Sequence, residues 1–202
     1  MSDKISLGQR RTGHRAPAKV MFIIVEGASE KIYFERFRTP NSPVAVRIHE
    51  SKDRDAEGMI RKCMHIIERS GLDTETDDVM AVFDADRNCT EDIQKAKELC
   101  SEHGIKMYIS NPSFEFWLLL HFEDDSATYI KDDLRDKLSK HLGVKYVKSA
   151  GINEYIEDKD ILKAIERSKK LLPDADPLRC ANIRPSTCLH LLVEKLMKKR
   201  PP

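Results

Sequence analysis

The sequence predicts an α/β fold, in which a mainly parallel sheet of about four strands is flanked by helices and followed by a helical C-terminal extension. Between residues 19 and 123, short apolar runs alternate four times with amphipathic stretches, a pattern typical of strand–helix units in a parallel sheet. Beyond residue 123 only helical periodicity recurs, and no linker-like segment separates that part. We therefore expect a flexible basic tail at 1–18 and a single domain at 19–202, made of an α/β core (19–123) and the helical extension (124–202).

The composition says more about where in the cell the protein works than about what it does. The 202 residues suit one domain with a real core. Charged residues make up 34% of the chain and nearly balance at net +1, so any nucleic-acid contact has to come from local patches. The five cysteines contain no Cys-x-x-Cys, and the seven histidines show no compact zinc spacing. With no signal peptide and no apolar run that could cross a bilayer, we expect a cytoplasmic protein without membrane association.

The first two strand–helix units are read from apolar runs and helix signals. Residues 20–25 form a continuous apolar strand, and Glu26 follows it. A helix opens at Ser29-Glu30 and ends near Pro40. The second strand is expected at residues 44–48, and a charged loop leads from it into a helix closed by Gly71. The buried face of that helix is expected to consist of Ile60, Cys63, Met64 and Ile67.

The third and fourth units follow the same pattern. Residues 79–83 are a buried strand, and Thr90 is the expected N-cap of a helix that ends at Gly104. The fourth strand covers residues 105–109. Asn111 as a cap and Pro112 as the first helical residue then predict the start of a helix that is apolar nearly all round and therefore buried.

Three helices are expected in the extension. The first runs from about residue 129 to Gly143, and the second covers residues 158–172 and stops at Pro173. The last covers residues 187–200 and faces inward with Leu189, Leu192, Val193 and Leu196.

An Asp-x-Asp pair, Asp84 and Asp86, follows the third strand. In an extended chain the two side chains point the same way, with Cα atoms about 7 Å apart. Two carboxylates that point into the same space repel each other, and proteins usually offset this repulsion by binding a hard cation between them. A solvated turn after a strand uses the same residues, so the pair alone stays ambiguous.

Polar residues also follow two other strands. Glu26 comes directly after the first strand and Asn111 after the fourth. Because ligands of open parallel sheets bind outside the carboxyl ends of the strands, Glu26 can meet Asp84 and Asp86 there if the first and third strands are near neighbours. Three carboxylates would hold one or two Mg²⁺ (or Mn²⁺) ions together with substrate phosphate oxygens. This chemistry suits phosphodiester cleavage, with Glu26 as a candidate general acid/base.

Four blocks of the sequence resemble a known family. They are Glu26-Gly27-Ala28-Ser29-Glu30 with Tyr33-Phe34, Phe83-Asp84-Ala85-Asp86, Ser110-Asn111-Pro112-Ser113-Phe114-Glu115-Phe116-Trp117-Leu118-Leu119-Leu120-His121-Phe122, and Pro185-Ser186-Thr187. The first two resemble the Toprim signature of topoisomerases, primases and OLD-type nucleases. The whole set is more similar to the RloB-like proteins, small Toprim-related proteins of bacterial restriction and abortive-infection loci. The matching blocks span about residues 20 to 197.

The resemblance implies a Toprim-like Rossmannoid fold and a metal-dependent endonuclease acting on RNA such as tRNA, or on DNA, in anti-phage defence. It also implies a separately encoded AAA/ABC-type ATPase as a partner. Carried over residue by residue, Glu26, Asp84 and Asp86 are the metal and acid/base group, with Asn111 and Glu115 as further catalytic residues. Two positions depart from the family pattern. Ser29 replaces the usual Thr, and Arg184 stands where Asn is usual before Pro-Ser-Thr.

Several residues keep two interpretations. Glu30 adds a carboxylate to the site or caps its helix, and Glu115 belongs to the site or only favours the dipole of its helix. Lys145, Tyr146 and Lys148 contact phosphate and stack a base, or form a solvated loop. His121 and Trp117 are expected in the core.

The functional alternatives also stay open at this point. The main hypothesis is a Mg²⁺-dependent nuclease. The second is a non-catalytic module that binds nucleic acid or an ATPase. The third, an Asp-x-Asp nucleotide-sugar transferase, leaves Glu26 and the Asn111 block without a role. The chain lacks a Gly-x-x-x-x-Gly-Lys loop, so it is not expected to hydrolyse ATP itself. The sequence leaves the substrate and the oligomeric state open, a homo-oligomer included.

Overall fold

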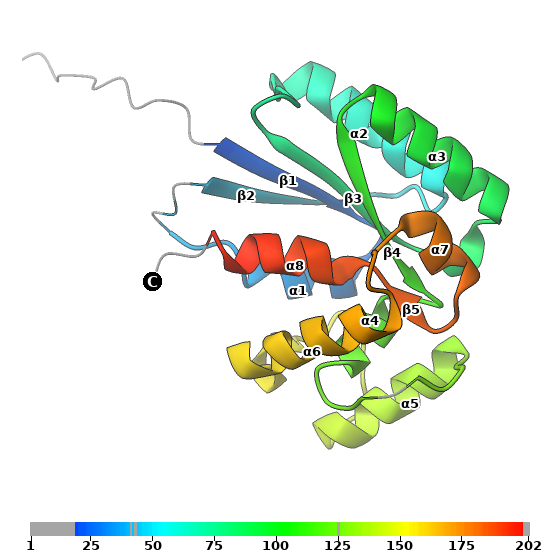
Figure 1. Ribbon diagram of the computed structural model, residues 1–202. Helices are drawn as coiled ribbons and strands as arrows, with labels where there is room; N and C mark the ends of the chain where they lie inside the picture. Colours follow the sequence, from blue (N-terminus) through cyan, green and yellow to red (C-terminus); the bar gives the residue numbers. More distant parts are fainter. Residues whose placement is uncertain (1–18, 41, 43, 125, 200–202) are drawn as a thin grey trace, which may run out of the picture.

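A five-stranded sheet forms the centre of the structure (Figure 1). Its first four strands are parallel, lie in the order β2-β1-β3-β4, and are joined by a short antiparallel strand, β5, at the edge next to β4. The strands are β1 (Lys19–Val25), β2 (Val44–Glu50), β3 (Asp78–Asp84), β4 (Ile105–Asn111) and β5 (Ser186–Thr187). The computed structural model describes residues 19–199 except 41, 43 and 125, and the predicted tail at 1–18 lies outside the described residues.

The central strands form because their sequences are apolar nearly throughout. All seven residues of β3 are buried, and so are six of the seven in β1. Burial on both faces is typical of parallel strands that are covered by helices on each side. In the register of the sheet, Val25 lies beside Val82, and Asp84 lies beside Ser110. The carboxyl ends of β1, β3 and β4 therefore reach the same edge of the sheet.

Helices cover both faces of this sheet (Figure 1). One face carries α1 (Ala28–Glu35) and α8 (Leu189–Met197), and the other carries α2 (Ala56–Ser70) and α3 (Thr90–Glu102). The chain leaves β1 through α1 toward one edge and crosses back through α2 to β3 on the other side of β1. The strand order thus reverses between β1 and β3, which is where ligands of open α/β sheets bind.

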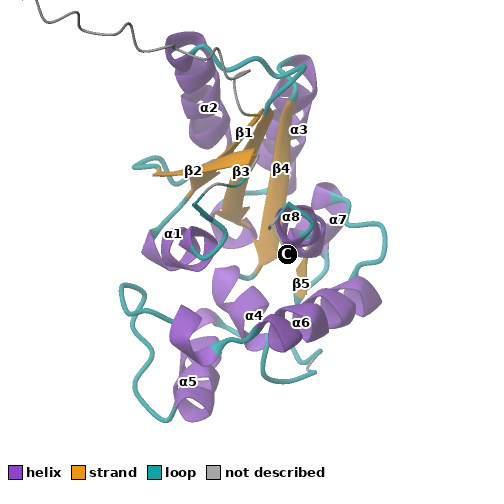
Figure 2. Cartoon of the chain, turned by 90° about the vertical axis from the view of Figure 1, so that its left-hand side faces the viewer, coloured by secondary structure: helices purple, strands orange, loops and turns teal. Residues whose placement is uncertain are grey.

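The remaining helices lie beyond the carboxyl ends of the strands and beside β4 (Figure 2). They are α4 (Phe114–Leu119), α5 (Lys131–Leu142), α6 (Asp158–Leu171) and α7 (Pro177–Asn182). Every residue of α4 is buried, as its all-round apolar sequence predicts. Among the described residues, none of the helices combines the length and the apolar character needed to cross a membrane.

The predicted α/β class with a mainly parallel sheet is confirmed, and the differences concern short elements. The expectation that only helices follow residue 123 is wrong because β5 lies there. Thr187, which we expected to begin the last helix, pairs with Ser110 of β4 instead, and that helix begins at Leu189. The helix α7 was not predicted either. Elements of two and six residues are too short for a periodic pattern to reveal them.

The predicted helix start at Asn111 and Pro112 is also wrong. Asn111 is the last residue of β4, and its peptide bond to Pro112 is cis. Ser113 is the N-cap, and α4 begins at Phe114. The local signal failed because Asn111 pairs with Ser186 in the antiparallel ladder, a contact with a distant part of the chain. A smaller shift occurs at α3, where Cys89 is the N-cap and Thr90 is already helical.

Candidate functional site

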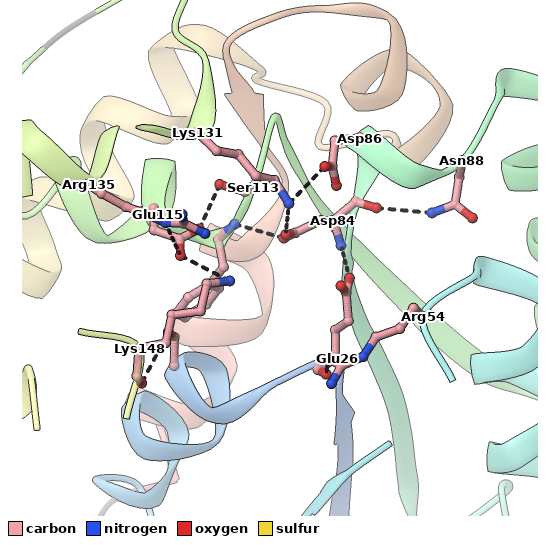
Figure 3. Close-up of polar contacts among 12 residues, drawn as sticks. Glu26, Arg54, Asp84, Asp86, Asn88, Ser113, Glu115, Lys131, Arg135 and Lys148 are labelled. Atoms are coloured by element: carbon pink, nitrogen blue, oxygen red, sulfur yellow. Dashed lines mark hydrogen bonds and ion pairs between the residues drawn. The ribbon is translucent and has the colours of Figure 1, made fainter. Parts of the chain in front are cut away.

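Glu26 and Asp84 meet at the carboxyl end of the sheet, at the point where the strand order reverses (Figure 3). Glu26 directly follows β1, and Asp84 is the last residue of the neighbouring β3. The backbone N–H of Asp84 donates a hydrogen bond of 3.1 Å to Oε2 of Glu26. Both side chains are buried, with exposed fractions of 5% for Glu26 and 2% for Asp84. The structure therefore brings these two predicted site residues together.

The carboxylate of Asp84 is held by groups from two later elements. Its Oδ1 accepts a hydrogen bond of 2.8 Å from the backbone N–H of Phe114, the first residue of α4. Its Oδ2 lies 3.0 Å from Nζ of Lys131, the first residue of α5. The backbone carbonyl of Asp84 accepts a bond of 3.1 Å from the side-chain amide of Asn88. The contacts with Phe114 and Lys131 fix the orientation of the carboxylate, and the bond from Asn88 holds the backbone.

Asp86 reaches the site by a different route from the one predicted. The expectation that Asp84 and Asp86 project from one extended strand is wrong, because the chain turns into a 3₁₀ helix at Ala85–Arg87. The two carboxylates converge on a lysine instead. Nζ of Lys131 lies 2.8 Å from Oδ2 of Asp86 and 3.0 Å from Oδ2 of Asp84. In this structure the cation between the two aspartates is an ammonium group.

The loop after β2 closes the other side of the site. A side-chain nitrogen of Arg54 donates a hydrogen bond to the backbone carbonyl of Glu26 (Figure 3). The side-chain oxygen of Asn88 accepts a bond of 2.8 Å from the backbone N–H of Ala56, at the start of α2. Asn88 thus links the turn that follows β3 to the loop that follows β2.

Glu115 forms a second, fully buried anionic position beside the first. It accepts a hydrogen bond of 2.7 Å from Oγ of Ser113, and Oε1 lies 3.1 Å from Nζ of Lys148 and 4.0 Å from Nε of Arg135. Burial alone would raise the pKa of Glu115, but Lys148 and the hydrogen bond from Ser113 outweigh it and lower the pKa. Glu115 is therefore a carboxylate at neutral pH.

Glu30 is a buried carboxyl group that the cluster leaves short of partners. It lies in the first turn of α1, is 3% exposed, and its Oε2 has no hydrogen-bond partner among the described residues. Burial, followed by the charge of Asp84, raises the pKa of Glu30 to about 8. Burial, followed by the charge of Glu26, raises the pKa of Asp84 to about 7, although Lys131 acts in the opposite direction. The cluster thus holds more buried carboxyl groups than its cations neutralise.

Asn111 and Lys145, two predicted site residues, lie outside this cluster. The side-chain amide of Asn111 donates hydrogen bonds to the carbonyls of Cys180 (3.1 Å) and Ala181 (2.8 Å), so it fastens β4 to α7. Lys145 is exposed and lines a hollow of about 230 Å³ at the end of α5. The structure does not bring either side chain to the acidic residues.

Tyr146 and Lys148 do not form the predicted basic and aromatic surface. The hydroxyl of Tyr146 is hydrogen-bonded to Oγ of Ser29 at 2.8 Å, and its ring is buried, so it offers no face for a base. Lys148 is partly exposed and pairs with Glu115. Ser29, which stands in place of the usual Thr, has a hydroxyl group that makes this contact. His121 is buried and bonds to Tyr33 at 3.1 Å, as expected of a core histidine.

Sequence reasoning missed the two cations on α5, Lys131 and Arg135. Both lie in a helix that looks like an ordinary charged surface helix, far along the chain from Asp84. One signal was available, because a lysine in the first turn of a helix faces the positive end of the helix dipole. That position is unusual enough to suggest an acidic partner elsewhere.

Carboxylates are the donor type that Mg²⁺ and Mn²⁺ prefer. The unpartnered oxygen of Glu30 and the pKa of Asp84, which burial and the charge of Glu26 raise, both indicate that the ionised forms of these groups are poorly stabilised. Glu26, Asp84 and Asp86 would hold such an ion. Within the described part of the chain, however, no three His, Cys, Asp or Glu side chains group closely enough to bind a metal as they stand. Nζ of Lys131 lies between the carboxylates of Asp84 and Asp86 instead.

Comparisons with known proteins give a family but no individual relative. No curated protein and no solved structure matches the chain significantly. The model of one protein family, described as RloB-like protein, matches residues 21–196 and so covers most of the chain, including all of the acidic site. The protein therefore belongs to the RloB-like family.

Proposed function

We propose that the protein is a metal-dependent nuclease that hydrolyses phosphodiester bonds in RNA, such as tRNA, or in DNA, as part of anti-phage defence. The observation that carries this proposal is the meeting of Glu26 and Asp84 at the point where the strand order reverses. Membership in the RloB-like family supports the defence-associated role. An AAA/ABC-type ATPase from the same defence locus is the protein partner that the family resemblance suggests.

The residues of the chain have separable roles in this proposal. Glu26, Asp84 and Asp86 would hold Mg²⁺ or Mn²⁺, which when bound supplies charge stabilisation and a water molecule of lowered pKa. The N–H of Phe114 keeps the Asp84 carboxylate aimed at that position. Arg135 and Lys148 have side chains that are 40% and 43% exposed, so they can reach phosphate groups outside while they pair with Glu115 inside. In the absence of an ion, the pKa of Glu30 is raised to about 8, so this group holds its proton at neutral pH.

The test is incubation of the purified protein with tRNA, single-stranded DNA and duplex DNA, with and without Mg²⁺ or Mn²⁺, followed by sequencing of the product ends. Asp84→Asn and Glu26→Gln should each lower the cleavage rate by at least about a hundredfold while the thermal unfolding curve stays cooperative. Asp136→Asn, which removes an exposed carboxylate from α5, is the matched control and should cleave like the wild type. Undiminished metal-dependent cleavage by Asp84→Asn would falsify the proposal.

One observation favours a second function, a non-catalytic module that binds nucleic acid or an ATPase. Lys131 already pairs with both Asp84 and Asp86, as it would in a site that never takes up a metal. Calorimetric titration with Mg²⁺ and Mn²⁺ separates the two functions. Binding that disappears in Asp84→Asn supports the nuclease, and the absence of any Asp84-dependent binding supports the module.

A further inference from the structure

We infer that Lys131 is an internal cation that competes with a divalent ion for Asp84 and Asp86, and that it binds a substrate phosphate once the ion has displaced it. The inference rests on the proposed function, because it describes how the same site would be loaded. It makes Lys131 both a competitor for the metal and a binding residue for a polyanion.

The position of Lys131 supports the competition. Its ammonium group touches one oxygen of each aspartate, at 3.0 Å and 2.8 Å. The side chain of Asp84 is 3% exposed, whereas those of Asp86 and Lys131 are 27% and 22% exposed. The ion pair therefore sits on the border between the protein interior and solvent. Lys131 has a path outward, and a hydrated ion has a path inward.

The helix that carries Lys131 does not favour the lysine at this place. Lys131 is the first residue of α5, where the backbone N–H groups leave a partial positive charge. The next two residues, Asp132 and Asp133, are the acidic type that suits this end. Among the described residues, the carboxylates that pair with this ammonium are those of Asp84 and Asp86. Once a divalent ion neutralises them, the lysine loses its main attraction and the helix dipole repels it.

Release of the lysine does not require α5 to move. Leu134 and Leu138 are fully buried and anchor the helix. The guanidinium of Arg184 also donates hydrogen bonds of 3.0 Å and 2.5 Å to the carbonyl of Tyr129, just before the helix begins. Since the start and the middle of α5 are fixed, rotation of the long lysine side chain is sufficient for the exchange.

The freed ammonium would join two cations that are already at the rim. Arg135 lies one turn further along the same face of α5. Lys148 is drawn toward the helix because both it and Arg135 contact Glu115 (Figure 3). Three cations along one rim suit successive phosphates of a nucleic-acid backbone. A bound ion would therefore strengthen nucleic-acid binding through Lys131.

This exchange predicts that one substitution, Lys131→Gln, strengthens metal binding and weakens metal-dependent binding of nucleic acid. The variant should bind Mn²⁺ about tenfold more tightly than the wild type by calorimetry, because the competing state is gone. Lys140→Gln, which removes an exposed lysine from the same helix, is the control and should bind Mn²⁺ like the wild type. Asp84→Asn should abolish binding in either background.

The second measurement is the fluorescence anisotropy of labelled tRNA, single-stranded DNA and duplex DNA, with Ca²⁺ as the divalent ion so that the phosphodiester bonds stay intact. In the wild type Ca²⁺ should tighten binding of at least one probe by about fivefold. Lys131→Gln should lose this gain and Lys131→Arg should keep it. Thermal unfolding of each variant checks the fold.

The outcomes separate this inference from the proposed function. Asp84-dependent Mn²⁺ binding that is equal in the wild type and Lys131→Gln overturns the competition and leaves the nuclease proposal standing. No Mn²⁺ binding by either protein overturns both. If Lys131→Gln keeps the Ca²⁺-induced increase in nucleic-acid affinity, the phosphate-binding role of Lys131 is overturned. The same holds if the wild type shows no such increase with any of the three probes.

Discussion

Single residues show that the site is short of positive charge. Glu30 and Asp84 are both buried, and both have pKa values raised to near or above neutrality. Lys131 is shared by the two aspartates, and Lys148 and Arg135 face Glu115. Oε2 of Glu30, by contrast, has no hydrogen-bond partner among the described residues. Such an imbalance destabilises a fold, so it is expected where function needs it.

The pH dependence of stability tests this imbalance at Glu30. The folded-state pKa of Glu30 is about 8, against about 4.5 in the unfolded chain. The folded protein therefore holds this proton more tightly, and the stability associated with it is complete below pH 4.5 and lost as the pH rises to 8. Glu30→Gln cannot ionise, so it should raise the unfolding free energy at pH 8 by about 3 to 5 kcal/mol and change it little at pH 4.5.

The measurement for Glu30 is urea unfolding in EDTA at several pH values between 4.5 and 8.5, since a bound ion would lower the pKa of a nearby carboxyl group. Glu68→Gln, which changes an exposed glutamate on α2, serves as the control and should follow the wild type. If the difference between Glu30→Gln and the wild type stays constant with pH, Glu30 is already ionised in the folded protein and the charge imbalance is not as described.

At the scale of elements, α5 matters because it carries two cations of the site on one packed face. Leu134 is fully buried one turn after Lys131. Leu134→Ala should destabilise the protein by about 2 to 4 kcal/mol, because it removes buried methyl groups and leaves a cavity. Leu162→Ala on α6, where the side chain is 58% exposed, should change stability by less than about 0.5 kcal/mol. Chemical denaturation measures both, and a loss under about 1 kcal/mol for Leu134→Ala would show that α5 does not pack as described.

The sequence predicts where strands and helices lie, and which residues reach one edge of the sheet, better than it predicts side-chain contacts between distant elements. The apolar runs of β1 and β3 locate the ends of those strands to within one residue, which is enough to bring Glu26 and Asp84 to one edge. Lys131 could not be predicted in the same way. It lies 47 residues after Asp84, and its helix shows only the usual pattern of a buried face with charged surroundings.

Asn111 illustrates the opposite error, in which a local signal is overridden by a distant contact. Its position before Pro112 favours a helix cap, but pairing with Ser186 keeps it in the sheet and turns its amide toward α7. The strand that does this has only two residues and gives no pattern of its own. The family resemblance marked Pro185-Ser186-Thr187 as a motif without showing that its backbone completes the sheet.

On the scale of the whole molecule, the two ends of β3 have opposite charge balances. Asp78, at the amino end, is 4% exposed and faces three lysines. Lys19 and Lys106 lie 3.1 Å and 2.8 Å from its oxygens, and Lys195 donates a further hydrogen bond. Asp84, at the carboxyl end, has one lysine and several acidic neighbours. The amino end is thus fully compensated and structural, whereas the carboxyl end is left undercompensated, which agrees with the proposed uptake of a cation.

The contrast between these two ends can be measured as opposite pH trends. Burial alone would raise the pKa of Asp78, but hydrogen bonds from Lys106, Lys195 and Lys19 outweigh it and hold the pKa well below its usual range. Its stabilising contribution is therefore complete above the unfolded-state pKa of about 3.8 and is lost as the pH falls further.

Asp78→Asn should lower the unfolding free energy by on the order of 3 kcal/mol at pH 7, because three lysines lose their shared carboxylate, and this deficit should shrink below pH 4. Asp136→Asn, at an exposed position, is the control. Relative to the wild type, the unfolding free energy of Asp78→Asn should therefore fall further behind from pH 3 to 5. That of Glu30→Gln should rise further above the wild type from pH 5 to 8. If both substitutions shifted the unfolding free energy in the same direction as the pH rises, the two ends of the sheet would not differ in charge compensation. The carboxyl end would then lack the imbalance that favours a bound cation.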